Sequence, residues 1–480
     1  MKIVFAASEA APFIKTGGLG DVAQSLPLEL SRVRDTEVLL FLPYYGKIKE
    51  DPSVKTEFVA SFEMNLSWRR LYVGLHRLSS KRRKERVFFI DNEAYFKRGS
   101  IYGEPDDGER FAFFSKAVLE SLVYLGEKPD IIHCNDWQTA LIPVMLHAFY
   151  QEALGDAKTV FTIHNIEYQG WVHPYFLGNV LGLPGEYNDT FQLGDGHNFM
   201  KSAILSCDAL TTVSRTYARE ICDPYFAHGL HRVISDHAFK LFGIVNGIDP
   251  DVNDPAKSQC LARPYGVKDH VAGKAENKAA LQKELGLEER PDVPVIGMVS
   301  RLVSHKGMDL FCSALRELEN WDVQFVILGT GDYFYENALK DAAARRPDRF
   351  SVNLCFRKDL ADRIYAGCDL FLMPSRSEPC GLSQLIAMHY GTVPVVHETG
   401  GLKDTVLPFR SDTGEGYGFT FQSFNREDML DALRRALTVY GTDKKAWQKA
   451  VTNGMTADLS WKVPAQEYLA LYQRLKDKTH

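Results

Sequence analysis

The sequence predicts an α/β protein made of two doubly wound, mostly parallel β-sheets, one in each half of the chain. The chain has 480 residues, whereas a single hydrophobic core stops growing at roughly 250–300 residues. Short apolar runs alternate with amphipathic stretches, a pattern typical of parallel strands covered by helices on both faces. This alternation occurs twice, on either side of a strandless stretch near residues 250–290.

The first half contains seven apolar runs that indicate buried strands. Helical patterns lie between them; in the segment 111–125, apolar residues recur at helical spacing. The predicted strands are 3–7, 38–42, 87–90, 130–134, 159–163, 209–213 and 242–245.

The second half repeats the pattern. The sequence NGID at 246–249 reads as a turn, so we predict domains of residues 1–246 and 247–455. The chain after residue 442 looks helical, with interruptions at Asn453-Gly454 and at Pro464. The predicted strands of this half are 294–299, 323–329, 352–356, 369–374 and 393–396.

Composition excludes several classes of protein. Lys and Arg number 56 and Asp and Glu 62, giving a net charge of −6, which argues against general attraction to nucleic acid or anionic membranes. The basic run 81–86 therefore reads as a solvated hairpin tip. We find no secretory leader and no apolar stretch of about 20 residues. Eight cysteines without a C-x-x-C pair fit a reducing compartment, so we expect a cytoplasmic protein.

Ligands of such sheets bind where the parallel strands end. After the first strand, Gly17, Gly18 and Gly20 precede a helix, where backbone N–H groups can approach a phosphate. Lys15 adds a positive charge beside them. Residues 18–23 also match G-x-G-x-x-A, a dinucleotide fingerprint, but the glycines come late after the strand and no acidic residue follows the second strand.

Two polar residues follow later strands of the same half. Asp136 comes after the strand 130–134 and His164 after the strand 159–163. Each has an ordinary structural explanation, because Asp136 could cap a helix and a lone His is more often structural than catalytic. Their convergence with the glycine loop on one sheet edge nevertheless predicts a site there.

The second half offers a cationic site. Arg301 and Lys306 lie just beyond a strand and can bind a diphosphate, although a solvated basic loop would also explain them. Glu378, Cys380 and Gly381 lie between a strand and a helix, and this position predicts a reactive thiol at Cys380. Another helix follows the stretch Thr399, Gly400, Gly401 and Leu402. The backbone N–H groups of this stretch are a second set of hydrogen-bond donors for an anion. No metal-ligand spacing or nucleophile elbow is present.

Together these segments resemble bacterial glycogen synthases and plant starch synthases. The resemblance covers nearly the whole chain in order, and KTGGLGDV and EPCGL are its most specific motifs. The matching segments are KTGGLGDV (15–22), HCNDWQT (133–139), TIHNIEYQG (162–170), VNGID (245–249), SRLVSHKG (300–307), PSRSEPCGL (374–382) and TGGLKDTV (399–406).

The resemblance implies a GT-B fold, in which two Rossmann-like domains face each other across a cleft and a C-terminal helix, here 456–480, returns to the first domain. It implies retaining transfer of glucose from ADP-glucose to the non-reducing end of an α-1,4-glucan, such as glycogen, without a metal or other cofactor. The first domain would be on the acceptor side and the second would bind the nucleotide sugar.

The same resemblance assigns individual residues. Lys15, Arg301 and Lys306 would hold the donor diphosphate, helped by backbone at Gly18 and at 400–402. By the same resemblance, the substrate-binding residues also include Gly17, Asp21, Gly381, Leu382 and Thr399 of the matching motifs. The residues expected around the transferred glucose or in the cleft are Asp136, His164, Asn246, Glu378, Cys380 and Tyr95.

Three positions depart from the family pattern. Phe356 stands where a tyrosine usually stacks on adenine, which leaves donor preference open, and Ser377 replaces an aromatic residue. Ile386 lies eight residues after Glu378, against families with an E-x7-E motif. The alternatives are another GT-B glycosyltransferase with a different acceptor, such as a sucrose synthase, a sugar-nucleotide epimerase, an NAD-dependent oxidoreductase, and an inactive glucan-binding protein.

Overall fold

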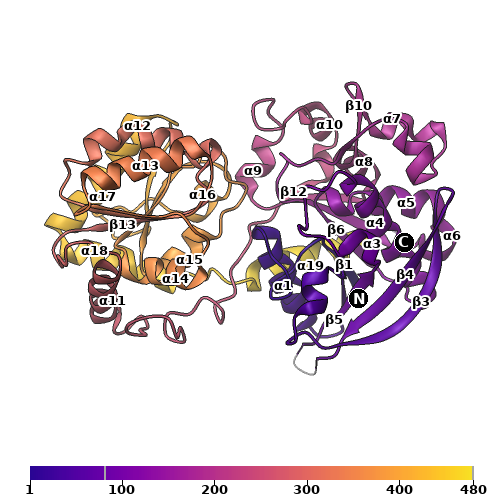
Figure 1. Ribbon diagram of the computed structural model, residues 1–480, viewed down its shortest axis with the longest axis horizontal. Helices are drawn as coiled ribbons and strands as arrows, with labels where there is room; N and C mark the ends of the chain where they lie inside the picture. The colour runs from indigo at the N-terminus through magenta and orange to yellow at the C-terminus, as the bar shows by residue number, and fades with distance from the viewer. Residues whose placement is uncertain (81–82, 478–480) are drawn as a thin grey trace. The chain divides into compact units, whose positions relative to one another are not determined.

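A computed structural model describes residues 1–80 and 83–477 and divides the chain into two compact units. Unit 1 contains residues 1–246 together with the stretch that begins at Trp461, and unit 2 is Gly247–Ser460. Figure 1 shows that each unit has its own central sheet covered by helices. The returning stretch therefore begins five residues later than the predicted 456.

Unit 1 is built on a nine-stranded sheet with the order β12-β11-β7-β6-β1-β2-β5-β4-β3. The seven strands from β12 to β5 are parallel, while β4 and β3 continue as an antiparallel hairpin. The strands are β1 (Lys2–Ala6), β2 (Glu37–Pro43), β3 (Thr56–Leu66), β4 (Arg69–Leu78), β5 (Arg86–Asp91), β6 (Ile131–Asn135), β7 (Lys158–Ile163), β11 (Ala209–Thr212) and β12 (Leu241–Gly243).

The helices of unit 1 cover this sheet, and a small antiparallel sheet of β8 (Trp171–Val172), β10 (Gly196–Asn198) and β9 (Gln192–Leu193) lies beside them. The returning helix α19 packs against α1. The helices are α1 (Gly18–Ser31), α2 (Gly46–Glu50), α3 (Glu93–Phe96), α4 (Asp107–Tyr124), α5 (Leu141–Phe149), α6 (Gln151–Leu154), α7 (Asn188–Phe191), α8 (Phe199–Ser206), α9 (Arg215–Glu220), α10 (His231–Asp236) and α19 (Lys462–Asp477).

Unit 2 has one parallel sheet with the order β15-β14-β13-β16-β17-β18. In chain order this is 3-2-1-4-5-6, the doubly wound arrangement. Figure 1 shows α12, α13 and α17 on one side of the sheet and α11, α14 and α15 on the other. The strands are β13 (Val295–Val299), β14 (Gln324–Leu328), β15 (Phe350–Asn353), β16 (Leu370–Met373), β17 (Val393–His397) and β18 (Phe419–Phe421).

The helices of unit 2 follow from apolar periodicity. In α12 the buried residues Met308, Phe311, Leu315 and Leu318 recur every three or four positions and form one apolar face. The helices are α11 (His270–Glu284), α12 (Met308–Leu318), α13 (Tyr333–Arg345), α14 (Lys358–Gly367), α15 (Ser383–His389), α16 (Gly400–Thr405), α17 (Arg426–Thr442) and α18 (Lys444–Thr456).

The structure corrects three local predictions. α18 runs through Asn453 and Gly454, which do not interrupt it. β15 ends at Asn353, so the predicted strand 352–356 lies mostly in a loop. The hairpin β3–β4 was not predicted, because its outer strand exposes one face and lacks a continuous apolar run.

Two further observations concern the basic run and membrane-spanning helices. The basic run 81–86 comes after β4 in the chain and ends at Arg86, the first residue of the antiparallel neighbour β5, and its residues 81 and 82 fall outside the described residues. Across the described part of the chain, no helix has both the length and the apolar character to span a bilayer.

Candidate active site

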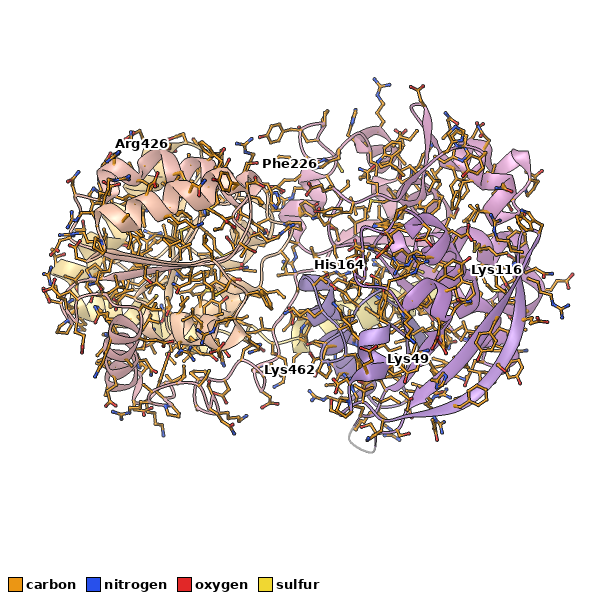
Figure 2. The ribbon with its side chains drawn as sticks, viewed as in Figure 1. Lys49, Lys116, His164, Phe226, Arg426 and Lys462 are labelled. Carbon is orange, nitrogen blue, oxygen red and sulfur yellow. The ribbon has the colours of Figure 1, made fainter. Side chains whose placement is uncertain are left out.

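Most of the predicted residues of unit 1 lie near the point where its strand order reverses. β1 has β2 on one side and β6 on the other, so the loops after β1 and β6 diverge and leave space at the carboxyl end of the sheet. Lys15 and the glycine run follow β1, Asp136 follows β6, and His164, labelled in Figure 2, follows the neighbouring β7.

Asp136 has an unusual backbone conformation. Its φ of 56° and ψ of −179° lie in a region that is essentially restricted to glycine, at a cost of order 1–3 kcal/mol. Its side chain makes no helix-cap hydrogen bond to the short 3₁₀ helix Trp137–Thr139 that follows. Instead its Oδ1 accepts the backbone N–H groups of His164 at 2.7 Å and of Asn165 at 3.3 Å. The helix-capping explanation of Asp136 is therefore wrong.

The protonation of both side chains is set by burial. Burial raises the pKa of the Asp136 carboxyl to about 7, against the opposing effect of its two backbone hydrogen bonds. Burial lowers the pKa of the His164 imidazole to about 3, so this ring is neutral at physiological pH.

Asn135 orients the His164 ring and was missed by the sequence analysis. Its Nδ2 donates to the carbonyl of Ala6 at 3.0 Å, so its Oδ1 faces His164 Nε2 at 2.9 Å. An amide oxygen only accepts, and Nε2 therefore carries the imidazole proton. The signal in the sequence was its place beside Asp136 at the end of a buried strand.

Glu9 is a second residue that the sequence analysis missed. The residue is 2% exposed. Oε2 accepts the N–H and the hydroxyl of Thr16, both at 2.6 Å, and Oε1 accepts the N–H groups of Gly17 and Gly20, both at 3.2 Å. Burial raises the pKa of Glu9, and these hydrogen bonds oppose that rise. The available signal was that Glu9 is the one carboxylate between β1 and the glycines.

The arrangement changes the interpretation of the glycine loop. The N–H of Gly17 is hydrogen-bonded to the protein's own carboxylate, so it is not directed at a phosphate in this conformation. Gly20 makes room for Lys15, because a Cβ there would lie 2.8 Å from Lys15 Cγ. Lys15 Nζ contacts Asp21 Oδ2 at 2.6 Å, an exposed pair that a phosphate can displace at little cost. Gly18 begins α1.

Tyr95 and Asn246 complete the predicted set of unit 1. Tyr95 is buried in α3 and its hydroxyl donates to Glu109 Oε1 at 2.6 Å, while burial and that carboxylate raise its pKa. Asn246, the last residue of unit 1, is 6% exposed. Within the described ranges its Oδ1 is buried without a hydrogen-bond partner.

Unit 2 has its own reversal of strand order, between β13 and β16. Lys306 follows β13 and Glu378 follows β16, and Lys306 Nζ lies 2.6 Å from Glu378 Oε2. Ser375 Oγ donates to the same carboxylate oxygen at 3.1 Å. Gly307, with φ of 78°, permits this approach, because a Cβ there would lie 2.0 Å from the carbonyl oxygen of Pro374.

The glycines after β17 join the same cluster. The N–H of Gly401 donates to the carbonyls of Glu378 at 3.0 Å and Pro379 at 3.1 Å, and that of Leu402 donates to Thr399. A Cβ on Gly400 would lie 2.0 Å from the Glu378 oxygen, and one on Gly401 2.2 Å from that of Cys380. The amides of Gly401 and Leu402 therefore already have partners within unit 2, and a phosphate would compete with them.

Three further residues of unit 2 were predicted to belong to the site: Cys380, Arg301 and Phe356. Cys380 is 4% exposed, which opposes the predicted reactive thiol; Gly381 and Leu382 lead from it into α15. Arg301 is exposed, and its Nη2 lies 3.4 Å from Nε2 of His305, the residue before Lys306. Phe356 follows β15 and is 94% exposed. Its predicted stacking on adenine stays a prediction.

Among residues 1–80 and 83–477, no group of three or more His, Cys, Asp or Glu side chains is placed to hold a metal ion.

Comparison with known proteins connects both units to one family. Residues 2–236 match the family described as starch synthase catalytic domain, and residues 280–452 match glycosyl transferases group 1. The chain is 46% identical to a glycogen synthase of Clostridium novyi, with 100% of both chains covered. It is 48% identical to a glycogen synthase of Exiguobacterium sibiricum, covering 98% of this chain and 99% of that one.

Solved structures agree with this relationship. The fold superposes with a TM-score of 0.91 on the catalytic domain of starch synthase IV from Arabidopsis thaliana, at 36% identity over 99% of both chains. A sucrose-phosphate synthase from Thermosynechococcus elongatus gives a TM-score of 0.60 at 16% identity over 99% of this chain and 98% of that one, a likeness of fold alone. The fold class is GT-B, and the chain belongs to the glycogen and starch synthase family of glycosyltransferases.

Proposed function

We propose that the protein is a glycogen synthase that transfers glucose from ADP-glucose to the non-reducing end of an α-1,4-glucan, with retention of anomeric configuration. The observation that carries the proposal is the Lys306–Glu378 pair, which sits at the strand reversal of a sheet with nucleotide-binding order. Full-length similarity to glycogen synthases supports the choice of substrates. The related Arabidopsis structure was bound to ADP and acarbose.

In the proposed reaction, the bond between glucose C1 and the phosphate oxygen breaks while a bond from C1 to the acceptor 4-oxygen forms. The acceptor proton passes to the departing phosphate oxygen, which leaves as ADP. Negative charge grows on that phosphate, and Lys306 and Arg301 stabilise it as fixed cations. Lys15 is proposed to add a third charge, and Phe356 to stack on the adenine.

Asp136 and His164 are proposed to position the glucose, whose hydroxyls are suited to a carboxyl with a raised pKa and a neutral imidazole. Glu378 is proposed to stabilise the positive charge that develops on the sugar rather than to attack it, since its carboxylate is already held by Lys306 and Ser375. No metal has a role in this scheme. We propose that the enzyme works in the cytoplasm.

The test is release of nucleoside diphosphate from ADP-glucose and UDP-glucose, each with and without glycogen and with and without EDTA. We expect ADP release that requires glycogen, exceeds UDP release and persists in EDTA. Equal or faster turnover of UDP-glucose would overturn the donor. Glucose transfer to fructose or another small acceptor in place of glycogen would favour a different GT-B glycosyltransferase. Loss of activity in EDTA that Mg²⁺ or Mn²⁺ restores would overturn the metal-free scheme.

A further inference from the structure

The helix α19 brings two tyrosines into the interior of unit 1. It begins at Lys462, two residues after the end of unit 2, and is drawn in yellow in Figure 1. Tyr468 and Tyr472 are one helical turn apart and so lie on the same face, where they are 1% and 0% exposed. Apolar side chains could fill this face equally well. The buried hydroxyl of Tyr472 therefore needs an explanation.

The hydroxyl of Tyr472 meets a buried histidine of the central sheet. Its oxygen lies 2.6 Å from Nδ1 of His133, which belongs to β6 and is 0% exposed. Burial holds the pKa of the Tyr472 hydroxyl well above its ordinary value, so this group stays protonated. Burial also lowers the pKa of His133 to about 3. The ring is therefore neutral, with one donor nitrogen and one acceptor nitrogen.

The second nitrogen of His133 extends the hydrogen bonds into the next two strands. Nε2 lies 2.6 Å from Oγ1 of Thr162 in β7, and that oxygen lies 2.5 Å from Oγ1 of Thr211 in β11. Both threonines are 0% exposed. Because a neutral imidazole donates from one nitrogen only, the bonds all run in the same direction along the chain of groups. Chains of this kind polarise and strengthen each bond.

This chain of hydrogen bonds adjoins the candidate site. The carbonyl of Thr162 accepts the N–H of Asp136 at 2.9 Å. Asn135, which orients the His164 ring, comes two residues after His133 in β6. His164 also contributes electrostatically to the lowered pKa of His133, so the two rings lie within range of each other. A shift of β6 against β7 would therefore displace both Asp136 and His164.

A buried polar chain fixes the strand ends more strictly than apolar packing does. Apolar side chains can repack at little cost when their volume is kept. A chain of buried hydrogen bonds is satisfied in one arrangement only, because any other leaves polar groups without partners. The chain thus selects one position of β6 relative to β7 and β11, and α19 supplies its outermost member.

We propose that Tyr472 is a positioning residue of the active site, which acts through His133 and Thr162 on the strand ends that carry Asp136 and His164. The proposal rests on the proposed function, because there Asp136 and His164 place the glucose. It gives α19 a role in the reaction besides completing the core of unit 1. Small displacements of reacting groups slow the chemical step, so loss of the Tyr472 hydroxyl should lower kcat more than it weakens substrate binding.

The test compares Tyr472→Phe and Thr162→Val with Tyr265→Phe. The first two each remove one oxygen of the chain and keep the shape of the side chain. Tyr265→Phe is the matched control, because Tyr265 of unit 2 is 2% exposed and its hydroxyl also donates over 2.6 Å, to the carbonyl of Tyr390. All three variants should lose thermal stability.

Only Tyr472→Phe and Thr162→Val should lower kcat, by about 2- to 12-fold, the range that corresponds to one hydrogen bond. KM for ADP-glucose and for glycogen should stay within about twofold. If kcat of both variants stayed within twofold of the wild type at a temperature where they are folded, α19 would be structural only and the proposal would be overturned.

Two further measurements separate positioning from stabilisation. In a His164→Ala background, Tyr472→Phe should lower kcat by a smaller factor than in the wild type, because one of the groups that it places is gone. An equal factor in both backgrounds would overturn the proposal. With 15N-labelled histidine, the imidazole signals of His164 should shift in Tyr472→Phe and not in Tyr265→Phe.

The NMR measurement needs no substrate. If the wild type transferred no glucose from ADP-glucose, the proposed function would fail, and the His164 signals would still decide whether Tyr472 positions this ring. Unchanged His164 signals in Tyr472→Phe would overturn the positioning role even if the proposed function held.

Discussion

The carboxylate of Asp136 accepts the backbone N–H of His164 at 2.7 Å and so ties the loop after β6 to the loop after β7. The bond is made from a backbone conformation that disfavours every residue with a side chain. Stability is thus given up to hold a carboxyl with a raised pKa at the end of β6, an arrangement typical of functional sites.

Asp136→Asn should make the protein more stable and less active. Because burial raises the pKa of Asp136 from 3.8 to about 7, the contribution of this residue to stability is fully present below about pH 4 and is lost as pH rises through 7. Asparagine does not ionise, still accepts two N–H groups and tolerates positive φ better. The thermal midpoint of the variant minus that of the wild type should grow between pH 5 and pH 8, measured by calorimetry. A constant difference across that range would show that Asp136 does not titrate there.

Glu9→Gln should weaken the glycine loop. The Gln amide presents a donor to N–H groups that now meet a carboxylate, and unsatisfied buried groups cost about 1–3 kcal/mol each. We expect a lower free energy of unfolding and a lower kcat, since Lys15 lies in the same loop, with KM for the glucan less affected. Denaturation and steady-state kinetics measure the two effects. Glu152→Gln, at an exposed position, is the control and should change neither the free energy of unfolding nor kcat. Equal changes in both variants would show that Glu9 does not support the site.

Lys306→Ala and Arg301→Ala should separate activity from stability. Each removes one cation from the proposed diphosphate site, so kcat should fall by roughly 10²–10³-fold in both. Only Lys306→Ala leaves a buried carboxylate, Glu378, without its ion pair, and only that variant should lose thermal stability. The double variant Lys306→Ala/Glu378→Gln should regain stability but not activity. Near-normal kcat in either single variant would place the diphosphate elsewhere.

Gly401→Ala should disrupt unit 2 locally. The new methyl group would lie 2.2 Å from the carbonyl oxygen of Cys380 and 2.3 Å from its Cα, so the backbone beside Glu378 must move. Overpacking of this kind costs typically about 1–3 kcal/mol, and kcat should fall with it. Gly441→Ala provides the comparison, because nothing lies within 4 Å of its added Cβ and it is in α17. That variant should be equally or more stable; similar losses in both would refute the packing argument.

The sequence was most informative where strands are buried on both faces. β1, β2, β6 and β7 are continuous apolar runs, and the loops after them could be located because parallel strands end at one edge. The motif resemblance then identified the family, which the full-length relatives confirm. The hairpin β3–β4 escaped prediction because its outer strand is half exposed and alternates in polarity.

The sequence could not predict which polar groups bond to one another in the folded protein. By itself the sequence determined the fold class, the seven parallel strands of unit 1, five of the six strands that the structure describes in unit 2, and the residue types that follow these strands, because they depend on local periodicity and chain order. It missed β18 as well as the hairpin β3–β4. Only the tertiary structure decided that Glu9 holds the glycine loop, that Asp136 turns toward His164 instead of capping a helix, and that Lys306 meets Glu378 across 72 residues. Such partners are chosen by the three-dimensional approach of loops distant in sequence, where burial and close packing leave each polar group few places to bond.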